Sequence, residues 1–324
     1  MASDLNWMQL DPEAAALLDL MAGADRRPWS SFPPGMVRTV LDEGMKAVAA
    51  RDIPIEKIEE LEVTYGDRSL GFRIYTPLGV RELVLPGIVY LHGGAFVAGS
   101  LDTHDSLCRL LANESKARVV AVDYGLAPEH PFPRALEDAI AALRWLSEHG
   151  SIAGIDPRRI VVAGDSAGGN IAAAACLVIR DEGAKPVRLQ ILIYPITDLR
   201  ADTASRRHLT QSYLAEAHAL DYTIEMYLGD DVDWRDFRVS PLRAEHLGGL
   251  PSALIVTAGL DPLRDEALAY GRALSAAGVP VEYLRYEKMF HGFLNATGVL
   301  NASRDAIRDI ATVLTRSLGH KQKK

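Results

Sequence analysis

A serine flanked by glycines stands between a predicted strand and a predicted helix. Residues 159–170 read Arg-Ile-Val-Val-Ala-Gly-Asp-Ser-Ala-Gly-Gly-Asn, and an alanine-rich stretch follows to residue 179. The β-branched run predicts a buried strand and the alanine-rich stretch predicts a helix, so the turn between them holds Gly-x-Ser-x-Gly. This order is typical of a nucleophile elbow, a strained turn that exposes the serine hydroxyl. Ser166 is therefore the predicted nucleophile; the flanking elements argue against the alternative of a chance match.

A serine hydroxyl becomes nucleophilic only when a base takes its proton, and His291 is the predicted base. It stands in Met-Phe-His-Gly-Phe after the last predicted strand, where the chain returns to the carboxyl edge of the sheet. Asp261 directly follows the preceding strand and is the predicted orienting acid; the alternative is that it only begins the next helix. Asp265 and Glu266 fall in the first turn of that helix, where they would complement its dipole. Ser166, Asp261, His291 is the chain order of α/β-hydrolases.

Glycines that follow an earlier strand are candidates for main-chain donors. The strand at residues 88–91 runs into His-Gly-Gly-Ala-Phe. Consecutive glycines let the backbone approach a reacting carbonyl while it presents N–H groups, which acyl transfer requires for the developing oxyanion. We expect the N–H groups of Gly93, Gly94 and Ala167 to form this oxyanion hole, and His92 to stabilise the loop by hydrogen bonding.

The remaining chain predicts the sheet that would position these residues. Apolar runs alternate with helical patterns from the third run onward, which predicts a mostly parallel sheet covered on both faces. The first two runs form a hairpin-like pair that suits an antiparallel edge. The fold class is therefore α/β with about eight strands. The predicted strands are residues 61–65, 72–75, 87–91, 118–123, 159–164, 189–194, 253–258 and 281–286.

Two regions fall outside this alternation. Residues 1–51 precede the first strand and contain two helical patterns, and residues 198–251 form the longest interval between strands. We expect both to fold over the carboxyl ends of the strands as a cap, with residues 52–197 and 252–324 forming the catalytic core. The alternative is that one or both only decorate the surface.

Several segments, taken together, resemble one family. Residues 61–324 carry these motifs in order: His92-Gly-Gly-Ala-Phe, Asp123-Tyr-Gly-Leu-Ala-Pro-Glu-His-Pro-Phe-Pro, Gly164-Asp-Ser-Ala-Gly-Gly-Asn, Asp261-Pro-Leu-Arg-Asp-Glu and His291-Gly-Phe. This set resembles the bacterial hormone-sensitive-lipase-like (type IV) esterases. The resemblance implies an α/β-hydrolase core, an N-terminal helical cap and carboxylesterase activity without a cofactor.

Two positions depart from the pattern of that family. Ala95 stands where a third consecutive glycine is usual, which adds a Cβ near the acyl site. Gly125 stands where an arginine is usual, which removes an expected ion-pair partner. The first departure leaves an oxyanion hole plausible, and the second bears on local stability more than on chemistry.

Composition excludes several classes of protein. The 324 residues include 35 Lys and Arg against 43 Asp and Glu, a net charge of −8, which argues against a nucleic-acid-binding surface. No apolar stretch reaches the length of a membrane span, and the N-terminus lacks the features of a secretory signal. Cys108 and Cys176 are expected to be free buried thiols, consistent with a cytoplasmic location. No metal or phosphate motif occurs, so no cofactor is expected.

The combined interpretation is a serine carboxylesterase that acts on short- to medium-chain esters through an acyl-enzyme. A small-molecule ester is the expected partner, and a homodimer is the candidate assembly. The same three residues also serve amidases, lactonases and carbamate hydrolases, so the motifs do not separate these activities. A non-catalytic receptor of the same fold is a further alternative, but it predicts a disabled triad, and all three members are present here.

Overall fold

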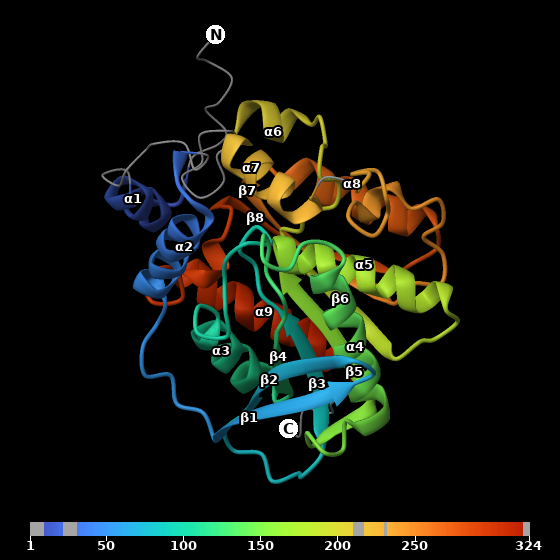
Figure 1. Cartoon of the computed structure of the whole chain (residues 1–324). Coiled ribbons are helices and arrows are strands. Elements are labelled where there is room, and N and C mark those ends of the chain that lie inside the picture. Colours follow the sequence, from blue (N-terminus) through green and yellow to red (C-terminus); the bar gives the residue numbers. More distant parts are fainter. Residues whose placement is uncertain (1–9, 22–30, 210–216, 230–231, 320–324) are drawn as a thin grey trace.

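An eight-stranded sheet forms the centre of the computed structural model, which describes residues 10–21, 31–209, 217–229 and 232–319 (Figure 1). The strands lie in the order β1-β2-β4-β3-β5-β6-β7-β8. Pairs β1–β2 and β2–β4 are antiparallel, and every other pair is parallel. The strands are β1 (Lys57–Tyr65), β2 (Arg68–Thr76), β3 (Leu85–Leu91), β4 (Arg118–Asp123), β5 (Ile155–Asp165), β6 (Val187–Ile193), β7 (Ser252–Leu260) and β8 (Val281–Phe290). The predicted fold class is confirmed.

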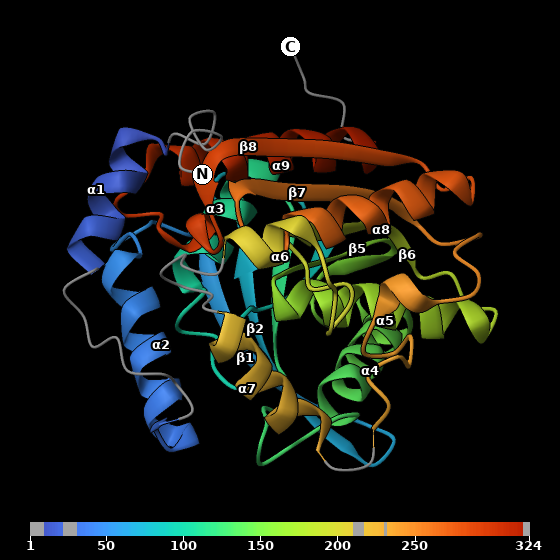
Figure 2. The ribbon, with the colours of Figure 1, turned by 90° about the horizontal axis from the view of Figure 1, so that it is seen from above.

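Helices cover both faces of the sheet, as Figure 2 shows from above. Neighbouring residues of β3 point to opposite faces: Val89 packs in the core beneath α4, α5 and α8, whereas Ile88 packs in the core beneath α3 and α9. All residues of β3 are buried for this reason, which explains its continuous apolar sequence. The helices flanking the sheet are α3 (Asp105–Ser115), α4 (Arg134–His149), α5 (Ala167–Asp181), α8 (Arg264–Ala276) and α9 (Asn301–Ser317).

The remaining helices belong to the two regions that interrupt the alternation. They are α1 (Pro12–Met21), α2 (Pro34–Val48), α6 (Ala204–His208) and α7 (Ala217–Leu228), with the 3₁₀ turns η2 (Pro241–Arg243) and η3 (Phe293–Asn295) in loops. Helix α2 is held to the loop after β3, because Arg38 Nε donates to the Val97 carbonyl at 2.7 Å and Asp42 accepts the Gly99 N–H at 2.8 Å. Part of the helical pattern expected between the sixth and seventh strands, residues 210–216, lies outside the described residues.

Candidate active site

Ser166 lies at the turn between β5 and α5, as the elbow motif predicts. Its backbone has φ 55° and ψ −116°, a conformation that non-glycine residues rarely adopt. A Cβ on Gly164 would overlap the backbone of Gly168, and a Cβ on Gly168 would overlap the Leu91 carbonyl oxygen of β3. Both glycines are thus required by the close approach of the turn to its own helix and to the neighbouring strand.

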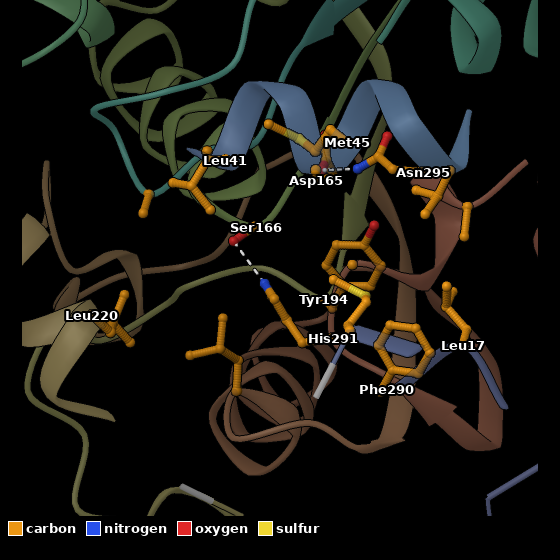
Figure 3. Close-up of a pocket in the computed structure, with 18 residues that line it drawn as sticks. Leu17, Leu41, Met45, Asp165, Ser166, Tyr194, Leu220, Phe290, His291 and Asn295 are labelled. Carbon is orange, nitrogen blue, oxygen red and sulfur yellow. Dashed lines mark hydrogen bonds between the residues drawn. The ribbon is translucent and has the colours of Figure 1, made fainter. Parts of the chain in front are cut away.

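His291 lies within hydrogen-bond distance of both Asp261 and Ser166, and Figure 3 shows its contact with Ser166. His291 Nε2 is 3.0 Å from Ser166 Oγ, and His291 Nδ1 is 2.8 Å from Asp261 Oδ2. The second carboxylate oxygen of Asp261 accepts the Leu263 N–H at 2.8 Å, which fixes the carboxylate. Since a carboxylate can only accept, Nδ1 carries the ring proton and Nε2 is free to accept the serine proton. The structure therefore brings these three predicted residues together.

The environment of His291 favours its protonated form. Burial by itself lowers the pKa of His291, but the adjacent Asp261 carboxylate outweighs burial and raises the pKa above its ordinary value. Asp261 is completely buried, so its charge is screened little by water. A histidine in this setting can accept a proton from the serine and hold it until the leaving group needs it.

The loop after β3 corrects one part of the predicted oxyanion hole. The Gly93 N–H donates to Asp165 Oδ1 at 2.9 Å, which removes Gly93 from the predicted set of donors. In the described part of the chain, the N–H groups of Gly94 and Ala95 make no hydrogen bond, and both residues line the cavity above Ser166. Ala167 is the first residue of α5, where an N–H has no intrahelical partner. The available donors are therefore Gly94, Ala95 and Ala167.

Ala95 is the residue that sequence reasoning missed as a donor. Its φ of 53° lies in the left-handed region, which explains why glycine is usual at this position. The departure from the family pattern at this position was the available signal. A position where glycine is usual is one where the backbone N–H, and not a side chain, takes part in the site.

His92 stabilises the loop, in agreement with the expectation. Its Nδ1 lies 2.8 Å from the Gly93 carbonyl oxygen, and its ring stacks on Tyr124 with centroids 4.4 Å apart. Tyr124 also donates to the His92 carbonyl at 2.6 Å. Burial lowers the pKa of His92 to about 4, so the ring is neutral at physiological pH.

An apolar cavity opens above Ser166 and His291 (Figure 3). Its walls come from helices α1, α2 and α7, from the loop after β3 and from the turn after β8. Asp165 is the one acidic residue among the described lining residues, and none of them is Lys or Arg. The apolar and aromatic lining side chains are Leu17, Met21, Leu41, Met45, Val48, Tyr194, Leu220, Leu263, Phe290 and Ala296. Such a lining suits an uncharged substrate with apolar groups.

Two acidic residues do more than complement a helix dipole. Glu266 is completely buried and pairs with Arg206 of α6, with Nε 2.8 Å from Oε2. Asp265 accepts the Ser205 N–H at 2.8 Å. The dipole interpretation is therefore incomplete, because both carboxylates hold the segment after β6 against α8.

The surroundings of Gly125 contain an ion pair although position 125 has no arginine. The Gly125 N–H donates to the buried carboxylate of Asp138, which also pairs with Arg68 and Arg134. A Cβ on Gly125 would lie 2.7 Å from Arg134 Cγ. Arg134 thus occupies the space that a side chain at position 125 would need.

Two features are absent from the described residues. These residues contain no cluster of three or more His, Cys, Asp or Glu side chains that could hold a metal ion. None of the helices in the described ranges is long and apolar enough to cross a membrane.

Comparison with known proteins gives consistent matches. A family model described as alpha/beta hydrolase fold matches residues 88–295. Esterase LipI of Mycobacterium tuberculosis is 41% identical over 279 residues, which cover 83% of this chain and 87% of the relative. Ethyl acetate hydrolase of Pseudomonas putida is 35% identical over 319 residues, which cover 96% of this chain and 100% of the relative. The structure of an ester hydrolase from the metagenome of Lake Arreo matches with a TM-score of 0.92 at 39% identity, covering 96% of this chain and 100% of that one.

Proposed function

The chain belongs to the hormone-sensitive-lipase-like carboxylesterases of the α/β-hydrolase superfamily, and from this premise we propose that it hydrolyses short- to medium-chain esters through an acyl-enzyme on Ser166. One observation carries the proposal: Ser166 Oγ, His291 Nε2, His291 Nδ1 and Asp261 Oδ2 form a continuous hydrogen-bonded line that ends in an apolar cavity. This is the arrangement that acyl transfer needs.

The proposed reaction has two stages. Ser166 Oγ attacks the ester carbonyl while His291 accepts the hydroxyl proton, and the oxyanion receives hydrogen bonds from the N–H groups of Gly94, Ala95 and Ala167. The C–O bond to the alcohol then breaks as His291 returns the proton to the leaving oxygen. In the second stage His291 takes a proton from water as the water attacks the acyl carbon. The bond between that carbon and Ser166 Oγ then breaks, His291 returns the proton to Oγ, and the acid leaves.

The substrate class follows from the lining of the cavity. Its apolar walls and the absence of Lys or Arg among the described lining residues favour neutral esters over those that carry an anionic group near the carbonyl. Side chains from α1 and α2 line the cavity above the serine and limit the space for the acyl group, which favours short or medium acyl chains. The printed name of one relative, ethyl acetate hydrolase, supports a short acyl group.

The cap is part of the same proposal. Residues 1–51 supply Leu17, Leu41 and Met45 to the cavity, and residues 198–251 supply Leu220. We assign both regions to a cap over the core of residues 52–197 and 252–324.

The assembly and the location of the protein are also proposals. We infer a homodimer, because β8 is an edge strand of the sheet and unpaired strand edges favour pairing with another chain. We infer a cytoplasmic location, because Cys108 and Cys176 are free buried thiols. Sedimentation equilibrium tests the first inference, and fractionation of the native host tests the second.

The function is tested with a series of p-nitrophenyl esters of increasing acyl length and a matched anilide. Ser166→Ala should lose turnover of every ester by about 10⁴-fold or more, since a triad nucleophile has no substitute. Ser115→Ala is the matched control, because Ser115 is buried in α3 and bonds only within that region. Substantial ester turnover by Ser166→Ala would overturn the proposal. If the wild-type protein turns over the anilide as fast as the matched ester, the assigned activity becomes that of an amidase.

A further inference from the structure

A buried carboxylate directly precedes the nucleophile, and the proposed reaction does not use it. Asp165 is 2% exposed, and its oxygens accept the Tyr90 hydroxyl at 2.8 Å and the Gly93 N–H at 2.9 Å. Burial by itself raises the pKa of Asp165, but His104 and these hydrogen bonds outweigh burial and lower the pKa to about 2. Asp165 is therefore a buried anion.

His104 is the buried ring that lies against this carboxylate. It is 1% exposed, and its Nε2 lies 3.2 Å from Asp165 Oδ1 and 3.3 Å from Oδ2. Its Nδ1 lies 2.9 Å from Thr103 Oγ1. The Thr103 hydroxyl has one proton and lies 2.9 Å from the Ser100 carbonyl oxygen; when it donates there, it accepts from His104. When both ring nitrogens of His104 donate, one to Asp165 and the other to Thr103, the ring is an imidazolium.

Asp165 connects three segments whose relative positions matter for the proposed reaction. Through Gly93 it holds the loop that presents the Gly94 and Ala95 N–H groups. Through the chain itself it is joined to Ser166. Through Asn295 of η3, whose Nδ2 lies 3.3 Å from Oδ2, it reaches the turn that follows His291, a contact visible in Figure 3.

We propose that His104 and Asp165 form a buried imidazolium–carboxylate pair that positions the oxyanion loop against Ser166. The proposal rests on the proposed function and deepens it. Asp165 acts as a positioning residue, because its carboxylate is occupied by Gly93, Tyr90, His104 and Asn295. An ion pair suits this role since its strength in a dry interior holds the loop more firmly than a neutral hydrogen bond would.

The kinetic test uses Asp165→Asn, which keeps the size of the side chain and removes its charge. A displaced loop weakens oxyanion binding and leaves substrate binding largely intact, so kcat should fall on the order of 10- to 100-fold with KM within about twofold. The affinity for an alkyl trifluoromethyl ketone, whose adduct with Ser166 carries the same oxyanion, should fall by the same factor as kcat.

Asp138→Asn is the matched control. Asp138 is likewise a buried carboxylate that accepts a backbone N–H and pairs with cations, but it lies on α4 and does not line the cavity. Its variant should lose stability while kcat and ketone affinity stay within about twofold of wild type. Loss of kcat in Asp165→Asn without weaker ketone binding, or a kcat within twofold of wild type, would overturn the positioning role.

The charge of the pair is tested separately on the wild-type protein by ¹⁵N NMR with labelled histidine. Protons on both ring nitrogens of His104 are expected, and a single protonated nitrogen would overturn the ion pair. This measurement does not depend on turnover or on the folding of a variant. It therefore separates a failure of this inference from a failure of the esterase proposal, which the Ser166→Ala experiment detects on its own.

Discussion

Phe96 and Tyr227 stack face to face, with ring centroids 3.9 Å apart and ring planes 7° from parallel. Phe96 lies in the loop after β3, directly beyond Gly94 and Ala95, and has a φ of 66°. Tyr227 belongs to α7, more than a hundred residues later in the chain, and both rings are buried. The segment between β6 and β7 thus contacts the loop that carries the proposed oxyanion donors, in addition to supplying a wall of the cavity.

Gly94→Ala should abolish most activity without unfolding the core. The added Cβ would overlap the Ala98 carbonyl oxygen, and the φ of 131° is one that L-residues avoid. The loop must shift, which misplaces the N–H donors, and loss of one such donor typically costs roughly 10²–10³ in kcat. Gly183→Ala is the control, since Gly183 also has a positive φ but open space around it. Equal kcat values for the two variants would contradict the proposed oxyanion hole.

The acid limb of the pH profile should report His291. The base must be neutral to accept the serine proton, and Asp261 raises the pKa of His291. The midpoint of kcat/KM is therefore expected above about 6.5, with activity lost as pH falls through it. Asp261→Asn should lower this midpoint and reduce kcat by about 10⁴-fold. Asp265→Asn, a nearby carboxylate that pairs with Arg264, should leave the midpoint in place. A flat profile from pH 5 to 9 would exclude a histidine base.

Sequence patterns predicted the parts of this molecule that depend on neighbours in the chain. Ser166, Asp261 and His291 each follow a strand, and the apolar run before each of them marks the strand end. The strand boundaries were less exact: β5 begins at Ile155 rather than at the predicted Arg159, because polar residues at its start carry no apolar signal.

Features that depend on distant residues were not predictable. Gly93 resembles a donor in the sequence, but its N–H is taken by Asp165, 72 residues later. Glu266 resembles a dipole-complementing residue until the fold brings Arg206 against it from 60 residues earlier. The apolar pattern of α2 likewise indicated a helix, but not that Met45 would face the cavity while Met36 faces solvent.

Met45→Trp should shorten the preferred acyl chain. Met45 lines the cavity on the α2 side, so a larger side chain fills space that long acyl groups need. We expect kcat/KM for octanoyl esters to fall about tenfold or more while acetyl esters change by less than about threefold. Met36→Trp is the matched control, because Met36 is on the same helix and 49% exposed. If both variants keep the wild-type chain-length profile, α2 is not part of the substrate site.

Because of Glu266, the free energy of unfolding should fall as pH rises. Burial raises the pKa of Glu266 from 4.5 to about 7, against the opposing effect of Arg206 and two backbone N–H groups. The folded state therefore binds this proton more tightly than the unfolded state, so its contribution is fully present below pH 4.5 and is lost as pH rises through 7. The loss is on the order of 3 kcal/mol. Glu266→Gln removes the titration, so the difference in unfolding free energy between wild type and this variant should narrow or reverse between pH 4.5 and 8, as measured by urea unfolding. Glu282→Gln removes a partly exposed glutamate paired with Arg316 and should leave the pH dependence unchanged. If the curves of wild type and Glu266→Gln run parallel, Glu266 is ionised throughout this range, and its pair with Arg206 holds α6 against α8 as a permanent ion pair.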